Sequence, residues 1–244
     1  MQQQYWRILD YSSKHPALNL AIEEAILRCL LEYNGFNTLR LWQNSPSVVI
    51  GYFQNPSSID VAACKKLGID ILRRVSGGGA VYHDYGNLNY SVIIHKSSLK
   101  ESVEDVEKSY DLFCSGIIEG LKLLGVNAYN NGGDILVRGK KVSGSAQFRL
   151  YDVILHHGTL MVNVNLKTLE RVLGVSAGKN LINLQDALPN KVSLNKVKNA
   201  VKAGFEKIFN VKFVKGTLSN IEKQEAKKLW KIKYSKEQWN IKNT

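Results

Sequence analysis

An arginine pair, three successive glycines and a His-Asp pair occupy residues 73–84, which read RRVSGGGAVYHD. Glycines let backbone N–H groups approach a ligand closely, and such groups bind phosphate oxygens. Flanking arginines add charge-assisted hydrogen bonds to a phosphate or carboxylate. The alternative is a flexible hairpin loop whose arginines lie in solvent. The combination of arginines, glycines and His83-Asp84 favours an anion-binding site.

Two common nucleotide motifs do not match. A Walker loop needs four residues between its glycines and a hydroxyl after the lysine, whereas Gly133 and Gly139-Lys140-Lys141 enclose five residues and lack the hydroxyl. A Rossmann fingerprint opens a helix, whereas Gly77-Gly78-Gly79 leads into the strand-like AVYH. A nucleotide site in this chain is therefore of another kind.

A second stretch, GKKVSGSAQFR at 139–149, combines lysine with small residues. Strict strand alternation places Lys141, Ser143 and Ser145 on one side and Val142 on the other. An inward Lys141 is a point charge with room for a phosphate or an activated carbonyl beside it. A lysine on a wet sheet face is the commoner arrangement, so this stretch alone leaves both readings open.

Other candidate residues carry weaker signals. His156 and His157 are adjacent on an expected strand and face opposite sides, which argues against a two-histidine metal site. Asp134 follows Asn131-Gly132-Gly133 and suits a metal or a ribose, although most turn aspartates need no function. A Ser-His-Asp hydrolase is not supported, because no G-x-S-x-G elbow is present.

Helical and strand-like patterns alternate along the chain, which favours a mixed α/β or α+β domain. The glycine run is expected to join two strands, and residues 38–43 and 47–53 are expected to form a hairpin through Asn44-Ser45-Pro46. Helices are expected at 18–33, 59–67, 103–124, 166–173 and 195–209. Strands are expected at 69–74, 88–94, 134–149, 153–164 and 213–214.

Composition sets outer bounds. With 244 residues, 44% of them hydrophobic, the chain can form one large domain. No signal peptide or membrane span is recognisable, and three widely spaced cysteines suggest neither disulfides nor zinc, so we expect a cytoplasmic protein. The net charge of +12 favours an anionic partner and leaves nucleic acid, nucleotide, acidic protein and membrane open, beside a merely solvated basic surface.

Taken in order, four stretches resemble the lipoate-protein ligases of the biotin and lipoate ligase group: NLAIEEAI, RRVSGGGAVYHDYGNLNYSV, GKKVSGSAQFR and LHHGTLMVN. The resemblance runs from about residue 5 to 240. It implies an α+β catalytic fold with mixed β-sheets flanked by helices, related to class II aminoacyl-tRNA synthetases. It also implies a single catalytic domain over 1–244 that lacks the C-terminal accessory domain of many lipoate ligases.

The resemblance implies a reaction in two steps. Lipoate and ATP, with Mg²⁺, give lipoyl-AMP and pyrophosphate, and a lysine of a lipoyl domain then attacks the mixed anhydride. The acceptors are E2 subunits of 2-oxoacid dehydrogenases and the glycine cleavage H protein, and a separate small accessory subunit is expected. No nucleic acid or membrane partner is implied.

Residue roles carried over from the family centre on Lys141, which would contact the acyl carbonyl and the α-phosphate in catalysis. The ATP and adenylate site would consist of Arg74, Gly79, Ala80, Val81, Tyr82, Lys141 and Asp134. The lipoate site would consist of Arg74, Gly78, His83, Lys141, Ala146 and His157. Asp134 is also the candidate for Mg²⁺, and for His83 and Asp84 shaping the loop is as good an explanation as touching ligand.

Three alternatives remain. Related octanoyl- and lipoyltransferases use a cysteine thioester and no ATP, but their cysteine positions here carry none: AYNNGGDI lacks one, and no cysteine follows Cys114. A biotin-protein ligase lacks support because neither a glycine-arginine-rich biotin loop nor an N-terminal helix-turn-helix is recognisable. A nonenzymatic nucleic-acid-binding protein would explain the charge, but no basic motif rich in aromatics is present.

Overall fold

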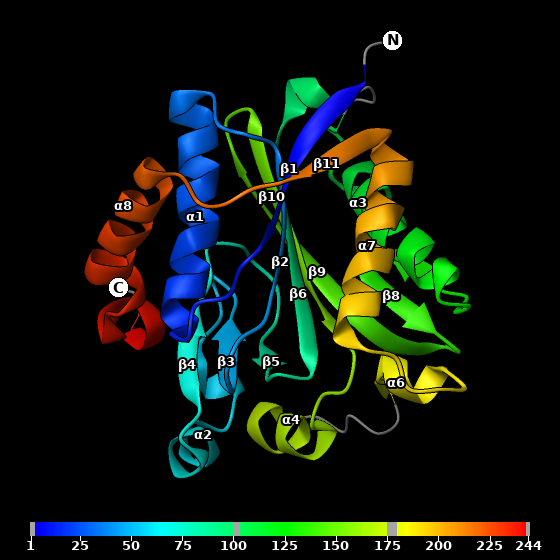
Figure 1. The fold of residues 1–244 in the computed structure, drawn as a ribbon. Coiled ribbons are helices and arrows are strands. Elements are labelled where there is room, and N and C mark those ends of the chain that lie inside the picture. Colours follow the sequence, from blue (N-terminus) through cyan, green and yellow to red (C-terminus); the bar gives the residue numbers. More distant parts are fainter. Residues whose placement is uncertain (1–2, 100–102, 175–179, 243–244) are drawn as a thin grey trace.

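The computed structural model describes residues 3–99, 103–174 and 180–242, which form two β-sheets and the helices that cover them (Figure 1). The larger sheet has the strand order β11-β1-β2-β6-β10-β9-β8-β7, and the smaller one has the order β4-β3-β5. The strands are β1 Gln4–Asp10, β2 Thr38–Trp42, β3 Ser47–Ile50, β4 Asp70–Arg73, β5 Val81–His83, β6 Asn87–His95, β7 Tyr129–Asn131, β8 Asp134–Val137, β9 Lys140–Leu150, β10 Val153–Met161 and β11 Val211–Lys215. The helices are α1 Pro16–Tyr33, α2 Val61–Leu67, α3 Val106–Leu123, α4 Leu166–Leu173, α6 Leu184–Ala187, α7 Leu194–Phe209 and α8 Asn220–Leu229. Short helical turns are η1 Pro56–Ser58, η2 Lys96–Ser98, η3 Trp230–Tyr234 and η4 Gln238–Lys242.

Helices cover both faces of the large sheet (Figure 1). On one face α3 and α7 pack over a core that includes Phe113 and Phe205. Gly204 allows these two helices to approach closely, because any residue with a Cβ atom at this position would overlap the carbonyl oxygen of Gly116. On the other face α1 packs against α8 and the sheet, and the small sheet lies beside them. The α+β architecture with mixed sheets is therefore confirmed.

The small sheet holds the glycine run. Its central strand β3 pairs parallel with β4 and antiparallel with β5, and residues 74–80 connect those two outer strands. The prediction that the glycines join strand to strand is thus correct. The predicted hairpin of 38–43 with 47–53 is wrong, because β2 pairs with β1 and β6 in the large sheet while β3 enters the small one. The buried Asn44 between them accepts a hydrogen bond from Asn19 of α1 and fixes this crossing.

The C-terminal turns close over the small sheet. Arg73 on β4 is fully buried, and its guanidinium donates to the carbonyls of Trp239 and Gly51. The indole of Trp239 donates back to the carbonyl of Arg73, and Asn240 accepts from the Arg73 backbone N–H. The end of the described chain therefore supports the strand that leads into the glycine run. Among the described residues, no helix is long and apolar enough to cross a membrane.

Candidate active site

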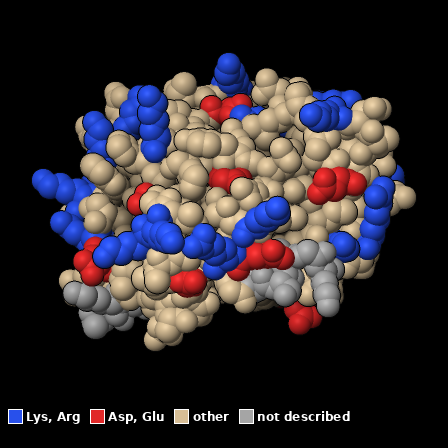
Figure 2. All heavy atoms as spheres, turned by 90° about the horizontal axis from the view of Figure 1, so that it is seen from below, with Lys and Arg blue, Asp and Glu red and all other residues tan. Residues whose placement is uncertain are grey.

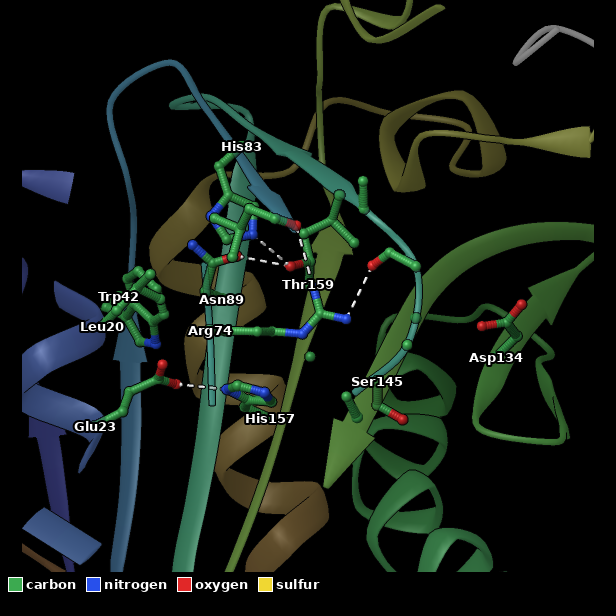
Figure 3. Close-up of a pocket in the computed structure, with 18 of the residues that line it drawn as sticks. Leu20, Glu23, Trp42, Arg74, His83, Asn89, Asp134, Ser145, His157 and Thr159 are labelled. Carbon is green, nitrogen blue, oxygen red and sulfur yellow. Dashed lines mark hydrogen bonds and ion pairs between the residues drawn. The ribbon is translucent and has the colours of Figure 1, made fainter. Parts of the chain in front are cut away.

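A cavity of about 270 Å³ lies between the glycine run, helix α1 and the centre of the large sheet (Figure 3). All the site residues predicted from the sequence line it, except Tyr82. They are Arg74, Gly78, Gly79, Ala80, Val81, His83, Asp134, Lys141, Ala146 and His157. The structure thus brings together residues from four strands and one loop, while their contacts to ligands stay predictions.

The floor of this site consists of three rows of side chains that cross neighbouring strands on one sheet face. Residues two apart on a strand share a face and stand about 6.6 Å apart, so the rows follow from the strand register. The outer row pairs Asn87 with Met161. The middle row consists of Trp42, Asn89, Thr159, Gly144 and Asp134. The inner row consists of Arg40, Ser91, His157 and Ala146.

Lys141 reaches the middle row because β9 is irregular. The register between β8 and β9 shifts at Ile135 and Leu136, which pair with Ser143 and Lys141, so a bulge inserts one extra residue. The Lys141 stem consequently lies over Gly144, and a Cβ atom there would come within 2.7 Å of Lys141 Cε.

The inward lysine is therefore confirmed, but its predicted neighbours are wrong. The hydroxyl groups of Ser143 and Ser145 point to the opposite face, toward Tyr90 and Cys114, although Ser145 also forms part of the cavity wall. Strict alternation does not hold across a bulge. Lys141 Nζ lies 2.7 Å from Asp134 Oδ1, at the edge of the cavity where both side chains are partly exposed.

Arg74 holds the glycine run in shape. Its Nε donates to Ser76 Oγ, its Nη1 to the carbonyl of Val49, and its Nη2 to the carbonyls of Gly77 and Gly79. Burial lowers the pKa of Arg74 to about 10. Among the described residues these contacts use four of the five guanidinium hydrogens, so one Nη1 hydrogen is left for the predicted contact with a ligand anion.

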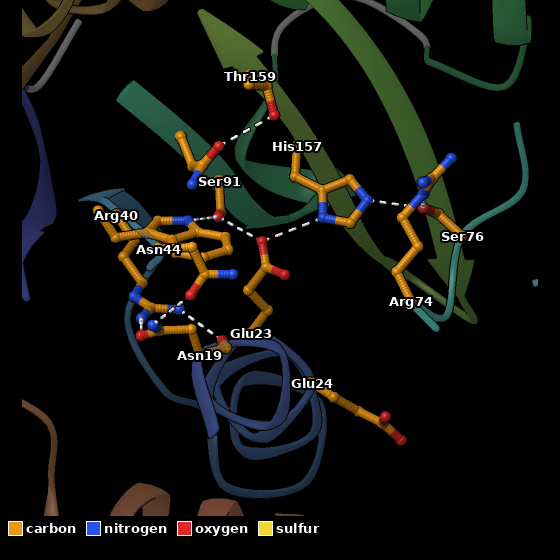
Figure 4. A network of polar contacts seen from close by, with 12 residues as sticks. Asn19, Glu23, Glu24, Arg40, Asn44, Arg74, Ser76, Ser91, His157 and Thr159 are labelled. Carbon is orange, nitrogen blue, oxygen red and sulfur yellow. Dashed lines mark hydrogen bonds and ion pairs between the residues drawn. The ribbon is translucent and has the colours of Figure 1, made fainter. Parts of the chain in front are cut away.

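A buried carboxylate that the sequence analysis missed anchors the inner row (Figure 4). Glu23 of α1 accepts hydrogen bonds from His157 Nδ1 at 3.0 Å and from Ser91 Oγ at 2.5 Å. The other His157 nitrogen, Nε2, lies 2.6 Å from Ser76 Oγ, so the contacts continue into the glycine run. Burial acts to raise the pKa of Glu23, but His157 and Arg40 together hold it below its usual value. The pair is separated by 134 residues, so no local pattern could indicate it.

His83 is a neutral hydrogen-bonding residue at the middle row. Burial lowers its pKa to about 3. Thr159 Oγ1 donates to Asn89 Oδ1, so His83 Nε2, at 2.9 Å, is the partner that donates to Thr159. Asp84 instead shapes the following turn, where its carboxylate accepts from the N–H groups of Gly86 and Asn165.

A second chamber of about 490 Å³ adjoins the first and is mainly apolar. It lies between β5, the ends of β6 and β10, and helix α4, and it contains the remaining predicted residue, Tyr82. Both chambers share the lining residues Ala80, Val81, Lys141, Gly144 and Thr159. Lys141 therefore stands where two compartments meet.

None of the described residues that line either chamber is a cysteine. The chain has three cysteines, Cys29, Cys64 and Cys114, and all are buried thiols on helices. Burial raises the pKa of Cys29 to about 11 and that of Cys114 to about 12, and it also raises the pKa of Cys64. Such thiols are poor nucleophiles because the thiolate is the reactive form.

A metal ion at this site would take some of its ligands from the substrate and the others from the protein. Among the described residues, no group of three or more His, Cys, Asp or Glu side chains could hold an ion. Mg²⁺ is commonly held by one or two carboxylates together with substrate phosphates, and the partly exposed Asp134 fits that role.

The two sheets, the glycine run and the inward lysine define a catalytic domain of the lipoate ligase type. The chain belongs to the family of lipoyl protein ligase A/B catalytic domains, whose model matches residues 15–206. Two curated relatives illustrate the range of that family. Octanoyltransferase LipM of Anoxybacillus flavithermus is 31% identical, over 99% of this chain and 100% of that protein. Lipoate-protein ligase A subunit 1 of Thermoplasma acidophilum is also 31% identical, over 92% of this chain and 91% of that protein.

Solved structures agree with the fold. A Thermoplasma acidophilum protein with bound lipoic acid superposes with a TM-score of 0.89 at 30% identity, over 98% of this chain and all of that one. A lipoate-protein ligase A bound with ATP gives the same score and identity, over 97% of this chain and 98% of that one. A bi-partite lipoate protein ligase from Thermoplasma acidophilum, described with its E2 lipoyl domain, also superposes with a TM-score of 0.89 at 30% identity, over 97% of this chain and 96% of that one.

Proposed function

We propose that this chain is the catalytic subunit of an ATP-dependent lipoate-protein ligase. The observation that carries the proposal is a pair of joined chambers that meet at Lys141 and have no cysteine among their described lining residues. A carboxylic acid resists attack by an amine until it is activated, and the activating group is here a nucleotide rather than a thiol. The second chamber supplies space for that nucleotide, and the chamber beside Glu23 and Trp42 receives the acyl chain.

Lys141 is the proposed catalytic residue. Its ammonium would leave Asp134 for the acyl carboxylate and the α-phosphate, whose negative charge it neutralises when the two come together. The same contact would stabilise the charge that develops when an acceptor amine attacks the activated carbonyl. The backbone of Gly79, Ala80 and Val81 would line the phosphate side.

The inner row positions the acyl chain in this proposal. His157 and Ala146 are neighbours across β10 and β9, and Glu23 orients His157 through Nδ1. Mg²⁺ would neutralise phosphate charge when bound, with Asp134 as its protein ligand.

The acceptor would be a lysine on a lipoyl domain, and a separate accessory subunit would complete the enzyme. The names of two relatives support this: one is subunit 1 of a ligase, and another is bi-partite and described with an E2 lipoyl domain. The net charge of +12 suits an acidic acceptor. Figure 2 shows Lys and Arg side chains spread over the face that carries α2 and α4, with fewer Asp and Glu between them.

A second candidate is an octanoyltransferase that works without ATP. The name of the LipM relative favours it, and that relative matches over its full length. Against it stands the burial of all three thiols of this chain. The two candidates make opposite predictions for ATP.

The test is to incubate the purified chain with a lipoyl domain, with and without a candidate accessory subunit, and with one of two acyl donors. One donor is lipoate or octanoate with Mg²⁺, with and without ATP, and the other is an octanoyl-carrier thioester without ATP. We expect AMP formation and a gain in acceptor mass only when ATP is present. A gain in acceptor mass from an octanoyl-carrier thioester in the absence of ATP would overturn the ligase assignment in favour of the transferase.

A further inference from the structure

Asn87, which lines the second chamber, carries a buried and unpaired amide nitrogen. Asn87 is 0% exposed, and its Oδ1 accepts a hydrogen bond from the Asp84 backbone N–H at 2.8 Å. Its Nδ2 has no hydrogen-bond partner in the part of the chain that the structure describes. A buried donor left unpaired is costly, and most such groups in native proteins have a partner. A ligand that occupies the chamber would supply the missing acceptor.

The position of Asn87 fixes which end of a ligand it meets. Asn87 pairs with Met161 in the outer row, about 6.6 Å along the strands from the middle row over which Lys141 lies. Leu169 and Leu173 of α4 also line the chamber. The charged end of a nucleotide belongs beside Lys141, so the base belongs at the apolar end with Asn87.

The amide can offer only a donor there. Its oxygen is committed to the turn at Asp84, so the nitrogen is the atom left for the ligand. The matching partner is an acceptor in the plane of a flat, otherwise apolar group. The ring nitrogens of a purine are such acceptors, while its faces can pack against Met161 and the two leucines.

We propose that Asn87 is a specificity-determining residue that donates a hydrogen bond from Nδ2 to a ring nitrogen of the purine base. This inference rests on the proposed function, because it requires that the second chamber bind a nucleotide. It assigns to the first residue of β6 a recognition role in addition to its hydrogen bond with the turn at Asp84.

The experiment compares binding of ATP with that of its 1-deaza, 3-deaza and 7-deaza analogues by calorimetry. We expect wild-type protein to bind one of the analogues about 3- to 10-fold more weakly than ATP, which is the cost of one neutral hydrogen bond. The Asn87→Ala variant should bind ATP more weakly by a similar factor and no longer distinguish that analogue. Asn87→Asp keeps the acceptor for Asp84 and loses the donor, so it should behave in the same way even if Asn87→Ala is unstable.

The Asn89→Asp variant is the matched comparison. Asn89 lies two residues along β6, lines the first chamber and also has an unpaired buried Nδ2. It should keep the discrimination among the purine analogues. Equal binding of ATP and all three analogues by the wild-type protein would overturn the role of Asn87 while leaving nucleotide binding intact. No binding of ATP at all would overturn the proposed function itself.

Discussion

Gly51 should control the position of the glycine run, although it lies outside both chambers. It follows β3, and its backbone packs directly against residues 77 and 78. A Cβ atom on Gly51 would overlap the carbonyl oxygen of Gly78 and stand 3.0 Å from that carbonyl carbon and 3.1 Å from that of Gly77. Ordinary contacts between carbon atoms are about 3.5–4.0 Å, and the overlap with the oxygen is tighter still, so in Gly51→Ala the run must retreat by roughly 1 Å or more. Gly51 does not have a positive φ, so its own backbone tolerates alanine.

A displacement of that size should weaken catalysis more than folding. Misplacement by about 1 Å can reduce rates by about 100-fold, so we expect kcat/KM for lipoylation to fall by about 10- to 100-fold. The assay is steady-state AMP release with the acid and ATP varied separately, beside a thermal unfolding curve for each protein. Gly77→Ala is the matched control, because its added Cβ has no neighbour within 4 Å and its φ is not positive. A folded Gly51→Ala protein with the kcat/KM of the wild type would refute the idea that this contact determines the position of the glycine run.

Three further predictions concern charge. Lys141→Met keeps the apolar stem and removes the ammonium, so kcat should fall by about 100- to 1000-fold while the unfolding temperature changes little; unchanged turnover would remove Lys141 from catalysis. Glu222 accepts a hydrogen bond from buried Arg7 at 2.8 Å and also caps α8. Glu222→Ala should therefore lower the free energy of unfolding, measured with urea, by about 3–5 kcal/mol, and a decrease below about 1 kcal/mol would contradict this. Burial lowers the pKa values of His83 and His156 to about 3, so both stay neutral in the fold while the unfolded chain binds protons below about pH 6.5. The unfolding free energy should therefore decrease as pH falls from about 6.5 toward 3, and His156→Phe should reduce that slope; a slope unchanged by the variant would contradict the assignment.

Much of the site could be predicted because its residues lie in short, distinctive stretches. Three successive glycines demand a loop, and the flanking runs of apolar residues read as strands, so the position of residues 74–80 followed from local chemistry. The adjacency of His156 and His157 likewise settled that only one enters the cavity, since strand alternation is regular on β10.

The remainder depended on contacts that local pattern cannot carry. The turn at Asn44-Ser45-Pro46 marked a change of direction correctly, but it could not tell a hairpin from a crossing between two sheets. The bulge in β9 moved Ser143 and Ser145 to the other face, and no residue in GKKVSGSAQFR announces it. Glu23 lies within the helix predicted at 18–33, and it is 2% exposed because its partners come from strands distant in the sequence.

The most direct test of the ligase assignment is the intact mass of the protein after it has reacted with its acyl donor. The chain is incubated with lipoate, ATP and Mg²⁺, or with an octanoyl-carrier thioester alone, and is then denatured and weighed. We expect an unmodified chain in both cases, with free acyl-AMP released in the first, because no thiol among the described residues faces either chamber. A chain that carries an acyl group on a cysteine after exposure to the thioester would contradict the assignment and identify a transferase.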